Sequence, residues 1–344
     1  KTAIFHHLKQ DPYFQNHIHV DPIDCTQLSD GSVWMPDLDR EAGLSRELPN
    51  ERFGVSKTNQ RGINGARPSF VFLDELAKAR QYIKDVLAPI VYERRVGNYH
   101  FVDGSVVCAA TNLTEEGLGD SIQPHLRNRL IFVQLRKPTK SEWVLWASGR
   151  RGFASEVIAF AEEYPKLFDS FLDYHKGGVH SGKQLEKDNP MIYNPLVPQE
   201  AYASPRSLAS SSIIVNKRDL IDDQTMQAAL EGTIGAPAAD ALGAYIRFGR
   251  DNPTFDEVRA DPAHARVASS PTAQIVMAFK LLSNTETRDD AEAATEYVGR
   301  MRAEMQSLFC NTVANGANDK TAMFATVTPF QTMLRENKIY FGSK

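Results

Sequence analysis

The chain has few cysteines, and their positions follow no known spacing. Three occur in 344 residues, at Cys25, Cys108 and Cys310. Disulfide frameworks and zinc sites need paired or closely spaced cysteines, so an odd number of distant ones argues against both. We therefore expect reduced thiols in a cytoplasmic protein, with Cys108 serving as a small core residue.

Long apolar runs and an excess of basic charge are also lacking. No stretch approaches the ~20 apolar residues of a membrane-spanning helix, and no signal peptide is visible. The net charge of -4 gives no overall positive field to attract nucleic acid. With 42% hydrophobic and 24% charged residues, the composition is that of a globular protein long enough for two or three domains.

The most informative segment is SFVFLDELAKA at residues 69–79, an apolar run that ends in Asp74 and Glu75. A strand buried on both faces of a parallel sheet has this apolar character. In P-loop nucleotidases the corresponding Walker B strand ends in an acid that holds Mg²⁺ against the phosphates of ATP. The second acid can polarise the attacking water. Any buried strand can end in Asp-Glu by chance. Whether this one is a Walker B strand therefore depends on the segments around it.

The segments that follow supply this context. A helix is expected at residues 76–88, and residues 105–112, SVVCAATN, then form an apolar β-rich run that closes on Asn112. At the tip of the strand beside Walker B, an Asn would lie near the γ-phosphate, which is the sensor 1 arrangement. Residues 121–135 predict a helix that leads into another apolar strand. This helix carries Arg127 and Arg129, where ring ATPases place arginines at the subunit edge.

In this order the segments resemble the AAA+ ATPases, and within them the MoxR branch. The matching stretches are LDELAKA, YERRVGNYHFVDGSVV, AATN, HLRNRL, EWVLWA and SPRS, with further likeness in DPIDCTQLSDG and LEGTIGAPAADALGAYI. The resemblance implies an α/β fold: a P-loop AAA+ parallel sheet with helices on both faces, followed by an α-helical lid and a helical C-terminal region. It also implies ATP and Mg²⁺ as ligands. The expected assembly is a ring, a hexamer by resemblance.

The resemblance implies two roles for three of the arginines. Family members usually place one Arg just before the apolar strand, so Arg129 is the preferred arginine finger and Arg127 the second choice. A finger stabilises the charge that develops on the neighbouring subunit's γ-phosphate. Arg206, in ASPRSL at the expected start of a helix, matches the sensor 2 position. The alternative for each is an arginine that only caps a helix or pairs locally.

One departure from the family pattern is the Walker A loop, G-x-x-x-x-G-K-[ST], which is absent as a complete motif. The sequence begins with Lys1-Thr2 and continues as a plausible helix, AIFHHLKQ. In a P-loop the Lys reaches the β- and γ-phosphates and the hydroxyl binds Mg²⁺. We interpret Lys1 and Thr2 as the end of a Walker A motif whose glycines precede the given sequence. The alternative is an accidental dipeptide.

The predicted organisation has three parts. The first is a nucleotide-binding domain at 1–137, with an insert of loops at about 34–69 and a pre-sensor hairpin at about 91–107. The second is a helical lid at 138–215, with a mobile insert at about 173–203. The third is a mostly helical region at 216–344.

Three functional classes are open on the sequence. The leading one is a MoxR-like ATPase that remodels or matures a protein complex, often with a von Willebrand A domain partner. A ring motor acting on DNA or RNA is the first alternative, and a nucleotide-gated scaffold with little turnover is the second. The balanced charge favours a protein client, whereas the intact Asp74-Glu75 pair argues against a scaffold.

Overall fold

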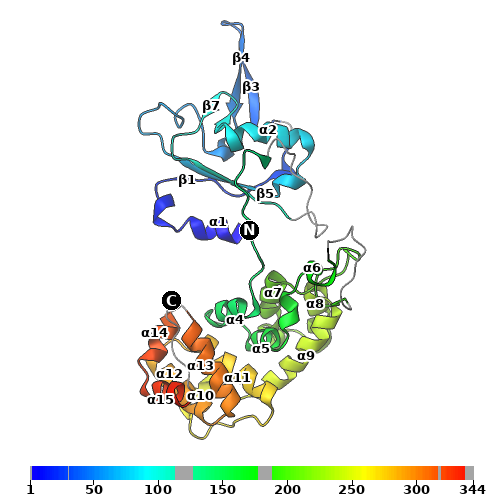
Figure 1. Cartoon of the computed structure of the whole chain (residues 1–344), viewed down its shortest axis with the longest axis vertical. Helices are drawn as coiled ribbons and strands as arrows, with labels where there is room; N and C mark the ends of the chain where they lie inside the picture. Colours follow the sequence, from blue (N-terminus) through cyan, green and yellow to red (C-terminus); the bar gives the residue numbers. More distant parts are fainter. Residues whose placement is uncertain (1, 30, 113–126, 177–187, 317–318, 338–344) are drawn as a thin grey trace. The chain divides into compact units, whose positions relative to one another are not determined.

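A computed structural model describes residues 2–29, 31–112, 127–176, 188–316 and 319–337 (Figure 1). The chain divides into two compact units, with the break between Leu135 and Arg136. Each unit is described by itself. Within the described ranges, none of the helices combines the length and the apolar character that crossing a membrane requires.

The first unit is an α/β structure built from short elements. In chain order they are α1 (Thr2–Leu8), η1 (Pro12–Phe14), β1 (Ile18–His19), β2 (Ile23–Asp24), η2 (Cys25–Gln27), β3 (Trp34–Asp39), β4 (Leu44–Pro49), η3 (Glu51–Phe53), β5 (Ser69–Asp74), η4 (Leu76–Lys78), α2 (Gln81–Tyr92), β6 (Arg95–Val96), β7 (Tyr99–His100) and β8 (Val106–Ala109). The segments labelled η are single 3₁₀ turns.

Strand β5 forms the centre of a parallel sheet. Strand β8 pairs along one of its edges, and β1 and β2 pair along the other. Because β1 and β2 follow each other in the chain in nearly the same register, they form one interrupted strand. The Walker B segment predicted from the sequence is therefore the buried central strand of a parallel sheet, as its continuous apolar character requires.

Alternate residues of β5 face opposite sides of the sheet, and each side is covered by a helix (Figure 1). On one side the Phe5 ring of α1 lies 4.8 Å from the Phe70 ring and 5.2 Å from the Phe72 ring, measured between centroids. On the other side Val71 and Leu73 share a core with residues of α2. This arrangement brings both helices against the strand that ends in the acidic pair.

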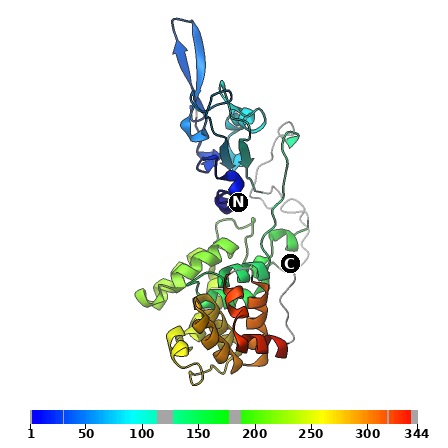
Figure 2. The same cartoon turned by 90° about the vertical axis from the view of Figure 1, so that its left-hand side faces the viewer.

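The region expected to consist of loops, at about 34–69, instead contains an antiparallel hairpin. Strands β3 and β4 pair from Trp34 with Pro49 to Asp39 with Leu44, and the hairpin projects from its unit in both Figure 1 and Figure 2. Its apolar residues Met35, Leu38 and Leu44 are 58–65% exposed. Since neither face of its outer part is buried, no alternation of polar and apolar residues reveals the strands in the sequence.

The second hairpin, β6–β7, turns at Gly97 and Asn98, within the range expected for the pre-sensor hairpin. This turn docks on the first hairpin, because the Asn98 side-chain oxygen accepts a 2.8 Å hydrogen bond from the Glu47 backbone N–H. A Cβ at Gly97 would lie 2.7 Å from the Glu47 carbonyl oxygen. The two hairpins are thus joined at this point, and only glycine fits there.

Two expectations about elements near the acidic pair are wrong. The expected helix at 76–88 is a 3₁₀ turn, η4, followed by α2, which begins at Gln81 and ends at Tyr92. The apolar segment at 130–135 is not a strand, and Ile131 and Val133 are 96% and 75% exposed. In the described residues β8 pairs only with β5, so this segment has no strand partner whose hydrogen bonds would make it part of a sheet.

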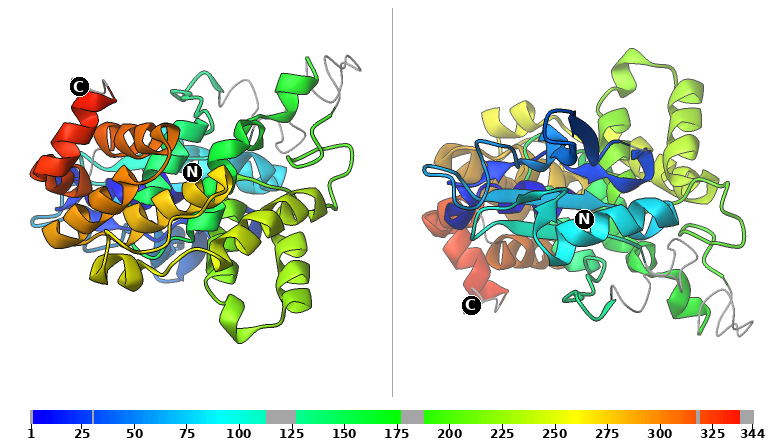
Figure 3. Two further views of the ribbon diagram at one scale, coloured as in Figure 1. Left: turned by 90° about the horizontal axis from the view of Figure 1, so that it is seen from below. Right: turned by 90° about the horizontal axis from the view of Figure 1, so that it is seen from above.

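The second unit is helical. Its described elements are α4 (Lys140–Ser148), α5 (Ser155–Glu163), η5 (Pro165–Phe168), α6 (Phe171–Tyr174), α7 (Pro205–Val215), η7 (Arg218–Leu220), α8 (Asp223–Ile234), α9 (Ala236–Arg250), α10 (Phe255–Ala260), α11 (Pro271–Asn284), α12 (Arg288–Gly299), α13 (Ala303–Asn315), α14 (Asp319–Ala325) and α15 (Thr328–Glu336). Helices α8 and α9 form an antiparallel pair (Figure 3). One hydrophobic core runs from Trp143 in α4 to Leu334 in α15, so helices on both sides of residue 215 share it.

Candidate functional site

The carboxyl ends of β5 and β8 meet at one edge of the sheet. The Ala110 N–H donates to the Leu73 carbonyl oxygen at 2.8 Å, and the Leu76 N–H donates back to the Ala110 carbonyl oxygen at 3.0 Å. These two bonds tie the turn after β5 to the end of β8. Asp74, the last residue of β5, and Asn112, which follows β8, are brought to the same edge in consequence.

Glu75 begins this turn in an unusual backbone conformation. Its φ of 53° and ψ of 36° lie in the left-handed region, where the described chain has one other non-glycine residue, Arg94. A residue with a Cβ is disfavoured there by roughly 1–2 kcal/mol and stays only where its surroundings hold it. Here the Asp74 carboxylate accepts a 3.0 Å hydrogen bond from the Glu75 N–H, and the Lys78 N–H donates to the Glu75 carbonyl oxygen at 3.0 Å.

The Glu75 carboxylate lies between an amide and an ammonium group. The Asn112 side-chain nitrogen is 3.3 Å from Oε1 and 3.4 Å from Oε2. The Lys78 Nζ is 3.4 Å from Oε2. The Glu75 side chain is 29% exposed, so water reaches it. A carboxylate has about four lone-pair sites, so this one can still accept a hydrogen bond from a water molecule.

Asp24 and Cys25 lie beside the acidic pair. Asp24 is in register with Asp74 on the neighbouring strand. Its carboxylate accepts hydrogen bonds from the Thr26 N–H at 2.9 Å and from the Thr26 hydroxyl at 2.6 Å, so it caps the turn η2. Burial, reinforced by the negative charges of Asp24, Asp74 and Glu75, raises the pKa of the Cys25 thiol to about 12. This thiol stays protonated and is no nucleophile at neutral pH.

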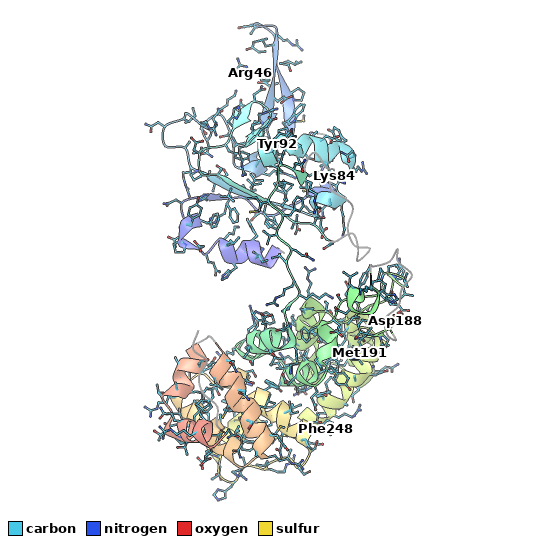
Figure 4. All side chains as sticks on the ribbon, viewed as in Figure 1. Arg46, Lys84, Tyr92, Asp188, Met191 and Phe248 are labelled. Carbon is cyan, nitrogen blue, oxygen red and sulfur yellow. The ribbon has the colours of Figure 1, made fainter. Side chains whose placement is uncertain are left out.

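The two candidate finger arginines are exposed, and each lies over an aromatic ring. The Arg129 guanidinium is 4.4 Å from the ring centre of Tyr92, the last residue of α2, which is labelled in Figure 4. Arg127 is 4.7 Å from the ring centre of Phe132. The start of the segment expected to form the helix with both arginines, residues 121–126, lies outside the described residues.

Two further predicted residues, Arg206 and Thr2, lie at helix starts. Arg206 is the second residue of α7 and is exposed, and Ser204 caps this helix. It belongs to the second unit, so its position is described only within that unit. Thr2 begins α1, so the helix expected near the start of the sequence is present, whereas Lys1 lies outside the described residues. The structure thus brings Asp74, Glu75 and Asn112 together, while the roles of the other residues stay predictions.

Two residues of this region were missed by sequence reasoning. Lys78 contacts Glu75, and the i to i+3 spacing within LDELAKA is the signal that could have revealed it. Tyr92 contacts Arg129 across 37 positions, and nothing in the local sequence points to that contact.

Neither models of protein families nor the sequences of curated proteins match this chain. Its function is therefore argued from its own residues and fold. In the described part of the chain, no three His, Cys, Asp or Glu side chains are grouped as the ligands of one metal ion.

Proposed function

We propose that this chain is a MoxR-like AAA+ ATPase that hydrolyses ATP in a ring to remodel or mature a protein complex. The observation that carries the proposal is the contact of Asn112 with Glu75 at the carboxyl ends of two adjacent parallel strands. ATP hydrolysis needs an acid for the metal, an acid for the water and a polar group near the γ-phosphate. Asp74, Glu75 and Asn112 supply these groups at one sheet edge.

The chemistry of the residues fits Mg²⁺ bound to a nucleotide. Mg²⁺ prefers oxygen ligands and, with substrate phosphates, usually takes one or two protein carboxylates and several waters. Asp74 provides such a carboxylate at the end of β5, and the Thr2 hydroxyl would be a second protein ligand. Lys1 would contact the phosphates. When bound, the metal neutralises charge on the phosphates.

Each protein group then has a distinct task. Glu75 accepts a hydrogen bond from the attacking water, and Asn112 holds the Glu75 carboxylate beside it. Arg129 acts on the nucleotide of the neighbouring subunit, with Arg127 as the second candidate and Arg206 as the sensor 2 arginine. In this proposal the client is a protein, with a von Willebrand A domain partner rather than nucleic acid.

The test separates binding from hydrolysis in the full-length protein. Glu75→Gln should bind ATP with near-normal affinity but lose at least ~10² in kcat, since the acid acts mainly on the transition state. Asp74→Asn should weaken binding of Mg²⁺-ATP. Glu51→Gln, an exposed residue of η3, and Asp85→Asn, an exposed residue of α2, serve as matched controls. Normal turnover by Glu75→Gln would remove Glu75 from the mechanism.

A further inference from the structure

The two oxygens of the Glu75 carboxylate differ in how many polar groups contact them. The Asn112 amide spreads its contact over both oxygens, at 3.3 and 3.4 Å, so it does not fix the carboxylate by itself. Lys78 contacts Oε2 alone, at 3.4 Å. Oε2 therefore has two contacts and Oε1 has one. More lone-pair sites remain on Oε1 to accept a hydrogen bond from water.

The backbone places the Lys78 side chain on the same side as the carboxylate. Glu75 is the residue before η4 and Lys78 is its last residue, and the Lys78 N–H bonds to the Glu75 carbonyl oxygen. The ion pair therefore joins positions i and i+3 across this one turn. The left-handed conformation of Glu75 and the tight turn after it therefore bring the ammonium group and the carboxylate together.

We propose that Lys78 is a positioning residue for ATP hydrolysis, which orients the Glu75 carboxylate so that Oε1 receives the attacking water. This inference rests on the proposed function. The competing explanation is an ordinary surface ion pair, because the Lys78 side chain is 39% exposed. Exposed ion pairs contribute little to stability, and a pair of that kind would leave the rate of hydrolysis unchanged.

The experiment measures kcat, KM and ATP affinity of the full-length protein with substitutions at position 78. Lys78→Met keeps the length of the side chain and removes its charge, and it should lower kcat by roughly 10-fold. This loss is smaller than that of Glu75→Gln, because a displaced base still works. KM and ATP affinity should stay within twofold of wild type. Lys78→Arg keeps a cation at the same place and should restore most of the rate.

Two further variants separate positioning from a general loss of charge. Lys9→Met removes the same group from another ion pair of the first unit, Lys9 with Asp21 at 3.7 Å, and should leave kcat unchanged. In the Glu75→Gln background, Lys78→Met should have no additional effect, since the carboxylate that it orients is gone. An equal loss in both backgrounds would show that Lys78 acts independently of Glu75.

The outcomes distinguish this inference from the proposed function. If wild type hydrolyses ATP and Lys78→Met is as fast or faster, Lys78 does not position the acid, and the proposed function stands. If Lys78→Met and Lys78→Arg are equally impaired, the charge of Lys78 is not what matters and the inference is overturned. Absence of ATP hydrolysis by wild type would overturn the proposed function and the role of Lys78 with it.

Discussion

Each unit of the chain contains an informative ion pair, and the two pairs differ in how exposed they are. In the first unit the Glu75 and Lys78 side chains form an ion pair while 29% and 39% exposed. In the helical unit the Glu156 side chain is 3% exposed and contacts Arg218 at 2.5 Å. In a partly exposed pair, water can replace either partner at little free-energy cost, whereas separating a buried pair costs much more. Partner exchange suits catalysis, and a fixed pair suits a rigid scaffold.

The surroundings of Glu156 explain why its pair is fixed. Glu156 lies in α5 and Gly249 in α9, and a Cβ at Gly249 would lie 2.3 Å from the Glu156 Oε1. The nearby Lys280 is partly buried, and the loss of contact with water lowers the pKa of its ammonium group. Helices α5, α9 and α11 contact one another around this cluster. Breaking it should therefore affect folding, whereas breaking contacts of the first unit should affect turnover.

The largest expected effect on turnover comes from Arg129→Ala. A finger that acts in trans stabilises charge on the neighbouring subunit's phosphate, so its loss should reduce ring ATPase activity by ~10³ or more. ATP binding and folding of the subunit should be retained. Arg127→Ala removes the second candidate, which also lies over an aromatic ring, and should reduce activity far less than Arg129→Ala. ATPase and ATP-binding assays provide the measurement.

Mixed rings test whether Arg129 acts in trans. Combining Arg129→Ala subunits with Glu75→Gln subunits should recover some activity, since some interfaces then have both an intact acid and an intact arginine. No recovery in rings shown to be mixed, or full activity of Arg129→Ala alone, would move the assignment to Arg127.

A second substitution tests the helical unit. Glu156→Ala leaves Arg218 and Lys280 without their buried carboxylate, and the free energy of unfolding should fall by about 3–5 kcal/mol. Chemical denaturation followed by circular dichroism measures it. The control is Glu292→Ala, which breaks the exposed Arg288 to Glu292 pair and should cost no more than about 1 kcal/mol. Equal losses in the two variants would contradict the contrast between buried and exposed pairs.

The two strands that carry the site were predicted from the sequence more successfully than the segments around them. The apolar run ending in Asp74 and the run before Asn112 had to be neighbouring strands of one parallel sheet for the predicted site to form, and they are, with β5 buried and β8 partly exposed. The β3–β4 hairpin was missed because its outer residues, such as Leu38, are exposed. The segment at 130–135 was expected to be a strand because it is apolar, and it is not one. An apolar segment becomes a strand only where a partner strand is available.

Other parts of the site were beyond local sequence patterns. The left-handed residue Glu75 lies between Leu73 and Leu76, whose backbones bond to Ala110 at the end of β8, more than 30 positions away. The stacking of Arg129 on Tyr92 depends on where α2 ends, and that helix ends four residues later than expected. Contacts that join distant segments follow from tertiary packing and are not visible as a periodic pattern.

The smallest expected effect concerns Lys320 in α14, which joins three helices of the second unit. Its Nζ donates to the carbonyl oxygens of Leu282 at 2.6 Å and Ser283 at 3.0 Å in α11, and of Ser148 at 3.4 Å in α4. Burial lowers the pKa of Lys320 to about 8, and the negative charge of Glu286 opposes this shift. An unfolded lysine has a pKa near 10.4.

The sign of the pH dependence follows from these two values. Below pH 8 both states bind the proton, and the folded state bears the full cost of burying the charge. Between about pH 8 and 10 the unfolded state binds more protons than the folded state, so this residue makes stability rise with pH. Because Lys320 is only partly buried, we expect a rise of about 1 kcal/mol. The difference in unfolding free energy between wild type and Lys320→Met, measured by denaturation at pH 7 and pH 10, should change by this amount in favour of wild type. An unchanged difference, or one that shifts toward Lys320→Met, would show that the ammonium group is not destabilised by its burial.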